Sequence, residues 1–363
     1  MKILVVLIAG IGDLIMASPG FRAIRNGHPE AEICLLTSTD ALPIAKHYPV
    51  LDEVIPFPIR ELRHHRHHLL HVAKLLWTLR KRRFDMAVNL FRVASCRGAL
   101  KMGLLFLALG AKRRIGHERA GFGLFLTDAV PAETFTNRHV VEAIGDIAAK
   151  IGGAPDSHGI EVFWSAASDA KWDPFFNSLN GEIVVGIHPG GDQESKRWPP
   201  ERFASVASAL SKRYGARIVL LGGPADTTLS EHIKRGLAAT AAVADLAGKV
   251  PLDELPCLIH RLDLLITNDS GPMHIAAATK TPLVAVFGPG DPTLNRPFTD
   301  PRGYRIVQKE VPCHRPCELK ICPHLSCLDL ISPEEVLEAC SEILGGGAAS
   351  LWTLPHISPT IST

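Results

Sequence analysis

Three short segments place glycine and a charged side chain in the loop that follows an apolar run. The motif GIGD, Gly10–Asp13, follows Ile3–Ile8; the motif HPGG, which begins at His188, is followed by Lys196; and NDSGPMH begins at Asn268 after the apolar LDLLIT. A carboxylate held on a glycine turn can act as a general base. A lysine beside glycine-exposed backbone amides can hold a phosphate group. These residue types together indicate chemistry on a phosphate-bearing substrate.

The carboxylate of Asp13 has two interpretations. Aspartate often occupies the N-cap of a helix, and a helix is predicted here from Leu14 to Asn26. Alternatively, Asp13 is a general base at the edge of a cleft. The motif lacks the third glycine of G-x-G-x-x-G, and no acidic residue is placed to bind a ribose about 20 positions later, so a dinucleotide site is weakly supported. A Rossmann oxidoreductase that uses NAD is therefore disfavoured.

Lys196 stands just before a helix that begins with proline. Beside the backbone amides of Gly190 and Gly191, its ammonium group can grip a phosphate. The spacing is not G-x-x-x-x-G-K-[ST], so a loop that hydrolyses ATP is not indicated. A solvated basic turn is the alternative.

The segment that begins at Asn268 carries the sharpest local signal. A buried strand ends in Asn268, Asp269 and Ser270, and Gly271–Pro272 then begin a helix that carries His274. Free amides and the helix dipole at such a start favour an anionic group such as a diphosphate. Asp269 or Ser270 as an ordinary N-cap is the alternative, and the two roles can coexist.

A histidine-rich basic segment spans Ile59–Phe84. His67 and His71 have the i, i+4 spacing of metal ligands, but the glutamate of H-E-x-x-H is missing. A solvated basic face is the default interpretation. The other is a patch for an anionic acceptor or a membrane surface, because basic side chains are attracted to an anionic leaflet.

Four of the eight cysteines crowd into one short segment: Cys313, Cys317, Cys322 and Cys327. The spacing lacks the C-x2-C pairs of the usual zinc sites, so no metal is expected. We expect free thiols that are either structural or redox-labile. A zinc or iron site and disulfides stay open as alternatives. The other four have apolar sequence neighbours and are expected in the core: Cys34, Cys96, Cys257 and Cys340.

Two series of short apolar strands, which alternate with helical segments, carry these motifs. The expected strands are Ile3–Ile8, Glu32–Leu36, Glu53–Pro56, Met86–Leu90 and Arg114–Gly116, then Ile183–His188, Arg217–Leu221, Ala242–Leu246, Leu264–Thr267 and Leu283–Phe287. This alternation predicts an α/β protein of two doubly wound parallel sheets, joined within Gly152–Gly181. Such sheets bind ligands beyond the carboxyl ends of their strands, where every motif stands. A substrate held between two facing sheets is therefore expected.

Composition fits a globular protein and excludes several classes. The 363 residues are 46% hydrophobic and 21% charged, with a formal net charge of +2, which excludes a collagen, a coiled coil and a small disulfide scaffold. The net charge is close to zero, so the overall electrostatic field gives no reason to expect a nucleic-acid partner. The N-terminal apolar run and Met102–Ala111 are too short to span a membrane, and the first does not fit a secretory signal. We expect a cytosolic protein with peripheral membrane contact left open.

Four sequence blocks in a fixed order resemble one family. The blocks MKILVVLIAGIGDLIMASPGFRAIR, IHPGGDQESKRWPPERF, GGPAD and ITNDSGPMHIAAATKTPLVAVFGPGDPT are similar to those of the glycosyltransferase family that contains the lipopolysaccharide heptosyltransferases. The resemblance implies the GT-B fold, in which two Rossmann-like domains face a central cleft. It implies an acceptor-binding domain at 1–165 and a domain at 175–345 that binds the nucleotide sugar. Residues 346–363 are mostly small or polar and carry no helix signal, so a flexible tail is expected there.

The resemblance also implies a role for each motif residue. Asp13 matches the family's catalytic base, and Lys196 matches the residue that neutralises the departing diphosphate. The implied donor contacts are Gly190 and Gly191 through backbone amides, Asp226 near the ribose, Val250 beside the adenine, Asp269 at the sugar, Ser270 and Gly271 at the diphosphate, and His274 beside them. Arg60 and Arg63 fall where relatives grip acidic acceptor sugars, although the histidines there depart from the family. No Asp-x-Asp motif occurs, consistent with a transferase that needs no divalent metal.

The resulting prediction is an inverting glycosyltransferase that moves heptose from ADP-heptose to a hydroxyl of the lipopolysaccharide inner core. No cofactor is expected to be required. The expected partners are ADP-heptose, the lipopolysaccharide core with its lipid A, and the inner face of the cytoplasmic membrane, without nucleic acid. The alternatives are another nucleotide-sugar donor, a protein acceptor, or a non-catalytic module that binds sugar nucleotide or lipopolysaccharide. The presence of both Asp13 and Lys196 disfavours the non-catalytic module, because a protein that only binds its ligand does not need a general base.

Overall fold

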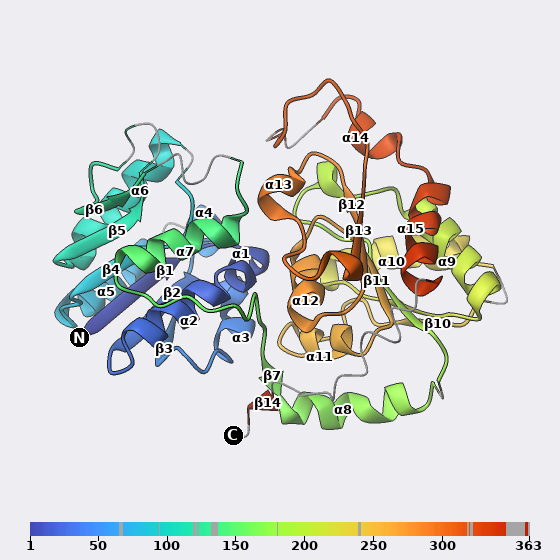
Figure 1. Cartoon of the computed structure of the whole chain (residues 1–363), viewed down its shortest axis with the longest axis horizontal. Coiled ribbons are helices and arrows are strands. Elements are labelled where there is room, and N and C mark those ends of the chain that lie inside the picture. The colour runs from blue at the N-terminus through green and yellow to red at the C-terminus, as the bar shows by residue number, and fades with distance from the viewer. Residues whose placement is uncertain are drawn as a thin grey trace. The chain divides into compact units, whose positions relative to one another are not determined.

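The chain forms two compact units, Met1–Glu161 and Val162–Thr363, in the computed structural model (Figure 1). The described residues are 1–64, 68–93, 95–118, 121, 123–131, 137–179, 181–238, 241–317, 319, 322–345 and 360–361. Each unit carries its own six-stranded sheet.

The sheet of the first unit has the strand order β3-β2-β1-β4-β5-β6, and all neighbouring strands are parallel. Its strands are β1 (Lys2–Leu7), β2 (Glu32–Ser38), β3 (Glu53–Phe57), β4 (Met86–Asn89), β5 (Arg113–His117) and β6 (Asp128–Val130). The order reverses between β1 and β4. In doubly wound sheets such a reversal leaves a ligand-binding crevice beyond the carboxyl ends of the two central strands. The loop with Gly10 leaves β1 at this place.

Helices cover the first sheet. They are α1 (Ile11–Met16), α2 (Ser18–Gly27), α3 (Leu42–Ala45), α4 (Glu61–His64), α5 (His68–Lys81), α6 (Cys96–Leu109) and α7 (Val140–Lys150). Helices α5 and α6 pack on the same face of the sheet, because Val72 and Leu79 of α5 and Phe106 of α6 share one buried cluster with Leu4 and Val6 of β1.

The second unit repeats the same topology. Its sheet order is β10-β9-β8-β11-β12-β13, again parallel throughout. The strands are β8 (Val184–His188), β9 (Arg217–Leu220), β10 (Val243–Asp245), β11 (Leu264–Asn268), β12 (Leu283–Phe287) and β13 (Tyr304–Gln308). The order reverses between β8 and β11. The HPGG loop leaves β8 at this point and Asp269 follows β11, so the reversal carries both motifs.

The helices of the second unit bury its central strands completely. They are α8 (Ala166–Asn177), α9 (Pro200–Tyr214), α10 (Thr227–Gly236), α11 (Leu255–His260), α12 (Gly271–Thr279), α13 (Pro292–Asn295), α14 (Ser326–Asp329) and α15 (Pro333–Gly345). Every residue of β8, β11 and β12 is buried. This explains their continuous apolar runs, since a strand covered on both faces has no polar side.

The predicted α/β architecture of two doubly wound parallel sheets is confirmed, with local differences. The single helix predicted at Leu14–Asn26 is two helices, α1 and α2, because Pro19 in the first turn of α2 has no N–H to continue the ladder. The edge strands β6 and β13 were not predicted. Strand β6 has only three residues and β13 is half-buried, so neither forms a long apolar run. Cys96 was expected in the core but is exposed at the start of α6.

Two short strands stand apart from the main sheets. Strand β7 (Trp164–Ser165) pairs in parallel with β14 (Thr360–Ile361). Thr360–Ile361 is the described part of the predicted tail, and the rest of 346–363 lies outside the described residues. Within the described ranges, no helix has both the length and the apolar composition needed to cross a bilayer.

Candidate functional site

The loops after β8 and β11 are joined by the buried side chain of Asn268. Its Nδ2 donates to the carbonyl oxygens of Pro189 (2.8 Å) and Gly190 (3.0 Å), and its Oδ1 accepts from the N–H of Trp198 (3.1 Å). These bonds fix the HPGG loop and the segment with Lys196 relative to β11. No such role was predicted for Asn268, because its partners lie at least 70 residues away in the chain.

Lys196 and Asp269 meet at the reversal point of the second sheet. Lys196 ends a short 3-10 turn, Glu194–Lys196, and its Nζ lies 3.4 Å from Oδ2 of Asp269. The Asp269 side chain is 7% exposed and that of Lys196 is 27% exposed. Burial raises the pKa of Asp269, and the nearby Lys196 cation opposes this rise. The site therefore holds a buried carboxylate beside a more accessible cation.

Two glycines permit the close approach of carboxylates at this edge. A Cβ added to Gly290, in the loop after β12, would lie 2.3 Å from Oδ2 of Asp269. A Cβ added to Gly190 would lie 2.6 Å from Oδ1 of Asp226. The Asp226 Oδ2 also accepts from the N–H of Gly223 at 2.9 Å. The structure thus brings Asp226 and Gly190 together, as well as Asp269 and Lys196.

Helix α12 begins at Gly271 with Ser270 at its N-cap position. The Ser270 side chain makes no capping bond to the helix, and its Oγ lies 3.2 Å from Oγ1 of Thr267. His274 follows in α12 and is buried. A helix start that is not capped by its own N-cap side chain is a favourable place for an anion.

The remaining predicted donor residues lie around this edge. Arg197 donates to the carbonyl of Gly191 from Nε (3.0 Å) and Nη2 (2.6 Å), which fixes the end of the HPGG loop. Gly248 donates to the carbonyl of Gly222 at 2.9 Å, so the half-buried Val250 follows a loop fixed to the end of β9. Burial lowers the pKa of His188, and the Asp226 carboxylate opposes this only in part. His188 is therefore neutral near pH 7 and brings no positive charge to the site.

Asp13 lies in the first turn of α1 and not at its N-cap. Gly10 is the N-cap, and Asp13 stands three positions later, where its Oδ2 accepts from the Gly10 N–H at 3.3 Å. The interpretation of Asp13 as the N-cap is therefore wrong, although its carboxylate does accept a hydrogen bond from a backbone N–H at the start of the helix. Asp13 is half-buried and follows β1 at the reversal point of the first sheet. This is a suitable position for a carboxylate that acts on a ligand of that unit.

The predicted acceptor residues are described only in part. Arg60 is 72% exposed, and its Nε lies 2.7 Å from Oδ2 of Asp40, a partner that was not predicted. The side chain of Arg63 lies outside the described part of the chain, as does His67 of the weak metal-ligand pair. His71, the other member, is exposed on α5.

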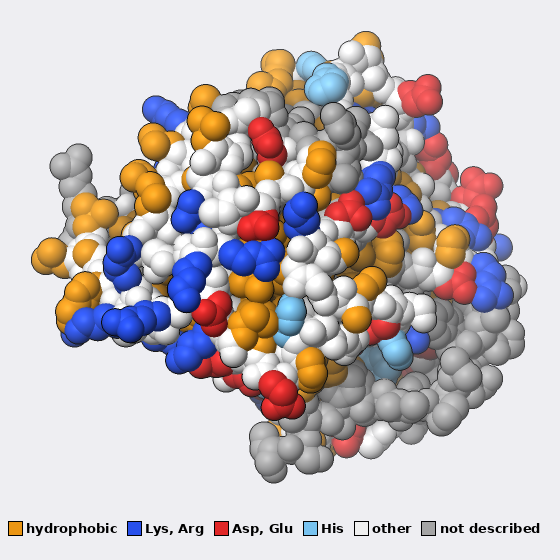
Figure 2. All heavy atoms as spheres, turned by 60° about the vertical axis from the view of Figure 1, so that its left-hand side comes forward, with side chains coloured by type: hydrophobic (Ala, Val, Ile, Leu, Met, Phe, Trp, Pro, Cys, Tyr) orange, Lys and Arg blue, Asp and Glu red, His pale blue; other side chains and the backbone are white. Residues whose placement is uncertain are grey.

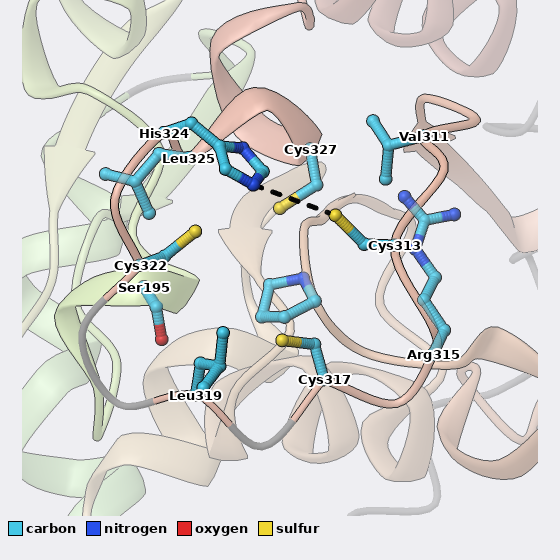
Figure 3. Close-up of a pocket in the computed structure, with 11 residues that line it drawn as sticks. Ser195, Val311, Cys313, Arg315, Cys317, Leu319, Cys322, His324, Leu325 and Cys327 are labelled. Carbon is cyan, nitrogen blue, oxygen red and sulfur yellow. Dashed lines mark hydrogen bonds between the residues drawn. The ribbon is translucent and has the colours of Figure 1, made fainter.

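The four clustered cysteines line one pocket together with His324, Ser195 and Pro289 (Figure 3). Sγ of Cys313 lies 3.9 Å from Nε2 of His324, and the N–H of Cys317 donates to the carbonyl of Pro289 at 2.9 Å. All eight cysteines are free thiols. The cysteine-rich loop therefore rests on the residues beside Lys196 and Gly290.

Among the described residues, one group of three ligand side chains is compact enough for a metal ion: Glu32, Cys34 and Glu53. Arg82 already occupies this group. Its guanidinium donates to Glu32 (2.5 Å) and Glu53 (2.6 Å) and lies 3.1 Å from the sulfur of Cys34. The same contact lowers the pKa of Glu32. A cation would have to displace this arginine, so the group is an ion-paired cluster.

Known proteins are similar to this chain in sequence and in fold. Residues 72–321 match the model of a family described as glycosyltransferase family 9 (heptosyltransferase). The chain is 27% identical over 351 residues to lipopolysaccharide heptosyltransferase 3 of Escherichia coli K12, an alignment that covers 93% of this chain and 97% of the relative. The solved structure of E. coli ADP-heptose lipopolysaccharide heptosyltransferase II is similar, with a TM-score of 0.73 and 25% identity over 95% of this chain and 99% of that one. A family 9 glycosyltransferase from Veillonella parvula has a TM-score of 0.80 and 25% identity, covering 95% and 98%.

Proposed function

Since the chain belongs to glycosyltransferase family 9, the heptosyltransferase family, and has the GT-B fold, we propose that it transfers heptose from ADP-heptose to a hydroxyl of the lipopolysaccharide inner core. The observation that carries this proposal is the Lys196–Asp269 pair at the reversal point of the second sheet. A cation beside a buried carboxylate suits a donor that joins a diphosphate to a sugar. Relatives named for lipopolysaccharide support the class of acceptor.

The second unit is the proposed donor site. Lys196 and the start of α12, with Ser270, Gly271 and His274, would hold the diphosphate, because both offer positive charge. The remaining donor contacts are the amides of Gly190 and Gly191 to the phosphates, Asp226 to the ribose, Val250 to the adenine and Asp269 to the sugar. Each of these residues lies at the carboxyl edge of the second sheet, which supports the assignment.

The proposed reaction is a single displacement with inversion. The acceptor hydroxyl oxygen attacks the anomeric carbon and its proton passes to the carboxylate of Asp13. The bond from the anomeric carbon to the diphosphate oxygen breaks, and its electron pair leaves with ADP. Proton transfer to a placed carboxylate contributes about 10²–10⁴-fold. The charge on the departing diphosphate would be stabilised by Lys196.

The first unit is the proposed acceptor site. Arg60 and Arg63 would contact acidic sugars of the acceptor, with Arg60 exchanging its exposed partner Asp40 for the ligand. An acceptor built on lipid A places the enzyme in the cytoplasm, at the inner face of the cytoplasmic membrane. The proposed reaction needs no cofactor, and the pocket lined by cysteines takes no part in it.

Calorimetric titration of the full chain with ADP-heptose, ADP, UDP-glucose and NAD tests the donor class. We expect selective binding of the two ADP compounds. Lys196→Ala should weaken both by about 10–100-fold, the loss typical of a hydrogen bond to a charged group. The matched control is Lys212→Ala, an exposed lysine of α9, which should bind like the parent. A preference for UDP-glucose or NAD, or equal binding by Lys196→Ala, would contradict the proposal.

A further inference from the structure

The positive charge of this protein is concentrated in one stretch of the first unit. Residues 62–117 contain 13 Lys and Arg but only one acidic residue, Asp85. The whole chain has 39 Lys and Arg against 37 Asp and Glu, so the rest of the protein is net negative. Helices α5 and α6 lie within this stretch and contain no acidic residue. Positive charge without negative charge on this pair of helices indicates a surface that binds a partner of opposite charge.

The same two helices expose large apolar side chains. On α6, Leu100, Leu104 and Leu107 are 65%, 59% and 60% exposed, and their spacing places them on one stripe of the helix. On α5, Leu70 is 80% exposed and Trp77 is 58% exposed. Isolated exposed leucines are ordinary, but a stripe of them on one helix, with an exposed tryptophan on the helix that packs next to it, is not.

These side chains point away from the sheet and toward the same side. Both helices bury their opposite faces in one cluster, with Val72 and Leu79 of α5 and Phe106 of α6 against the strands. Exposed lysines lie among the apolar residues: Lys74, Lys81 and Lys101. Figure 2 shows hydrophobic and basic side chains intermixed over much of the left half of the view. We call the outward residues of α5 and α6 the α5–α6 face.

We propose that the α5–α6 face attaches the protein to the surface of an anionic lipid bilayer. Leucines on one helix stripe can enter the boundary between headgroups and acyl chains, while flanking lysines stay at the phosphates. Trp77 has the amphipathic ring favoured at that depth, and the Nζ of Lys81 lies 3.3 Å from the centre of its ring. The inference rests on the proposed function in one respect, that a lipid-borne acceptor would lie at the same surface.

A bilayer explains both features of the face at once. An anionic protein would account for the lysines but would not need a stripe of exposed leucines. A second copy of the chain would cover the leucines but would bring two faces of equal positive charge together, which is unfavourable. An anionic membrane offers apolar depth and negative charge over a broad area.

Flotation of the full chain with lipid vesicles tests the proposal. We expect the protein to float with vesicles of phosphatidylcholine that contain about one third phosphatidylglycerol, and far less with pure phosphatidylcholine. Binding should weaken in about 1 M salt, where the Debye length falls to about 3 Å. Failure of the parent to float with the anionic vesicles at low salt would overturn the proposal.

Two variants locate the contact on the α5–α6 face. The leucine variant combines Leu100→Gln, Leu104→Gln and Leu107→Gln, and glutamine preserves the helix propensity of these positions. We expect its partition coefficient between vesicles and water to be lower than that of the parent by at least about 10-fold. Lys74→Gln with Lys101→Gln should lower it about 30-fold on anionic vesicles, at a typical contribution per charge. The control combines Leu330→Gln and Lys212→Gln, two exposed residues of the second unit, and should bind like the parent. Parent-like binding by both α5–α6 variants would overturn the proposal.

Two further measurements separate this proposal from others. Sedimentation without lipid compares the oligomeric state of the parent with that of the leucine variant. We expect the two to be the same. A dimer of the parent that is lost in the leucine variant would assign the face to a second copy of the chain. Transfer to a water-soluble acceptor without acyl chains should proceed in the leucine variant at the parental rate. If the parent transfers no heptose at all, the proposed function fails, while flotation still decides the membrane contact.

Discussion

Lys196 and Asp269, which are 73 residues apart in the chain, place Nζ 3.4 Å from Oδ2 at the point where the strand order of the second sheet reverses. Neither residue reaches this position through local structure alone. Strands β8 and β11 are neighbours, and Asn268 then fixes the loop that leads to Lys196 through Trp198 and Gly190. The buried amide of Asn268 thus fixes the positions of the loops that carry the proposed donor-binding residues.

Asn268→Asp should damage both stability and binding. The amide Nδ2 faces two carbonyl oxygens, and a carboxylate in its place would put oxygen against oxygen in a buried site. We expect the free energy of unfolding in urea to fall by about 3 kcal/mol, and ADP affinity to fall with it as the loops shift. Asn177→Asp, at an exposed position of α8, is the matched control. An unchanged urea midpoint in Asn268→Asp would contradict the role given to this amide.

Two substitutions at Asp13 separate its structural role from its proposed catalytic role. Asp13→Asn keeps an oxygen that can accept from the Gly10 N–H but cannot take a proton from the acceptor. We expect it to fold like the parent and to lose at least about 100-fold in turnover. Asp13→Ala should lose the same activity and about 1 kcal/mol of stability as well. Both should still bind ADP. Turnover retained in Asp13→Asn would leave Asp13 with its structural role only.

Gly290→Ala tests the position of Asp269. An added Cβ would lie 2.3 Å from Oδ2 of Asp269, so the carboxylate must move away from its present place. We expect kcat/KM with the sugar donor to fall at least about 10-fold, whereas ADP, which lacks the sugar, should bind nearly as before. Gly145→Ala is the control, because a Cβ there meets no described heavy atom within 4 Å. Equal loss of ADP and ADP-heptose affinity would show that the effect is not confined to the sugar.

The first unit should lose stability in mild acid because of His117. Burial lowers the pKa of this imidazole to about 4, against 6.5 for an ordinary histidine, and its Nε2 lies 2.9 Å from the Ala143 carbonyl. The folded state therefore binds the proton less readily than the unfolded state. Stability from the neutral ring is complete above pH 6.5 and is lost as the pH falls toward 4, by about 3 kcal/mol in all.

Urea unfolding at several pH values checks this prediction. His117→Gln should show a shallower loss of stability between pH 6.5 and 4 than the parent, even if it is less stable at pH 7. His232→Gln, an exposed histidine of α10, should follow the parent at every pH. A parental slope in His117→Gln would assign the acid sensitivity to other groups.

The family, the glycosyltransferase class and the GT-B fold could all be predicted from the sequence. Buried parallel strands such as β11 are continuous apolar runs, and the ligand-binding edge follows from where these runs end. The two short helices at Pro19 also had a local signal, since proline removes one N–H from the ladder.

Other features could not be predicted because they depend on contacts distant in sequence. The three partners of Asn268 belong to a different loop, and the pairing of Arg60 with Asp40 joins two loops of the first unit. The proximity of Gly290 to Asp269 depends on β12 lying next to β11. Sequence spacing indicates which edge carries a residue, but not which side chains meet there.

Transfer itself tests the central claim most directly. The full chain would be incubated with ADP-heptose and a truncated lipopolysaccharide that lacks heptose, and the product analysed by mass spectrometry, with Asp13→Asn in parallel. We expect the acceptor to gain the mass of one heptosyl residue, ADP to appear in equal amount, and the new linkage to have the inverted anomeric configuration. The Asp13→Asn reaction should remain near background. No product from the parent with this donor, alongside transfer from UDP-glucose, would contradict the heptose assignment.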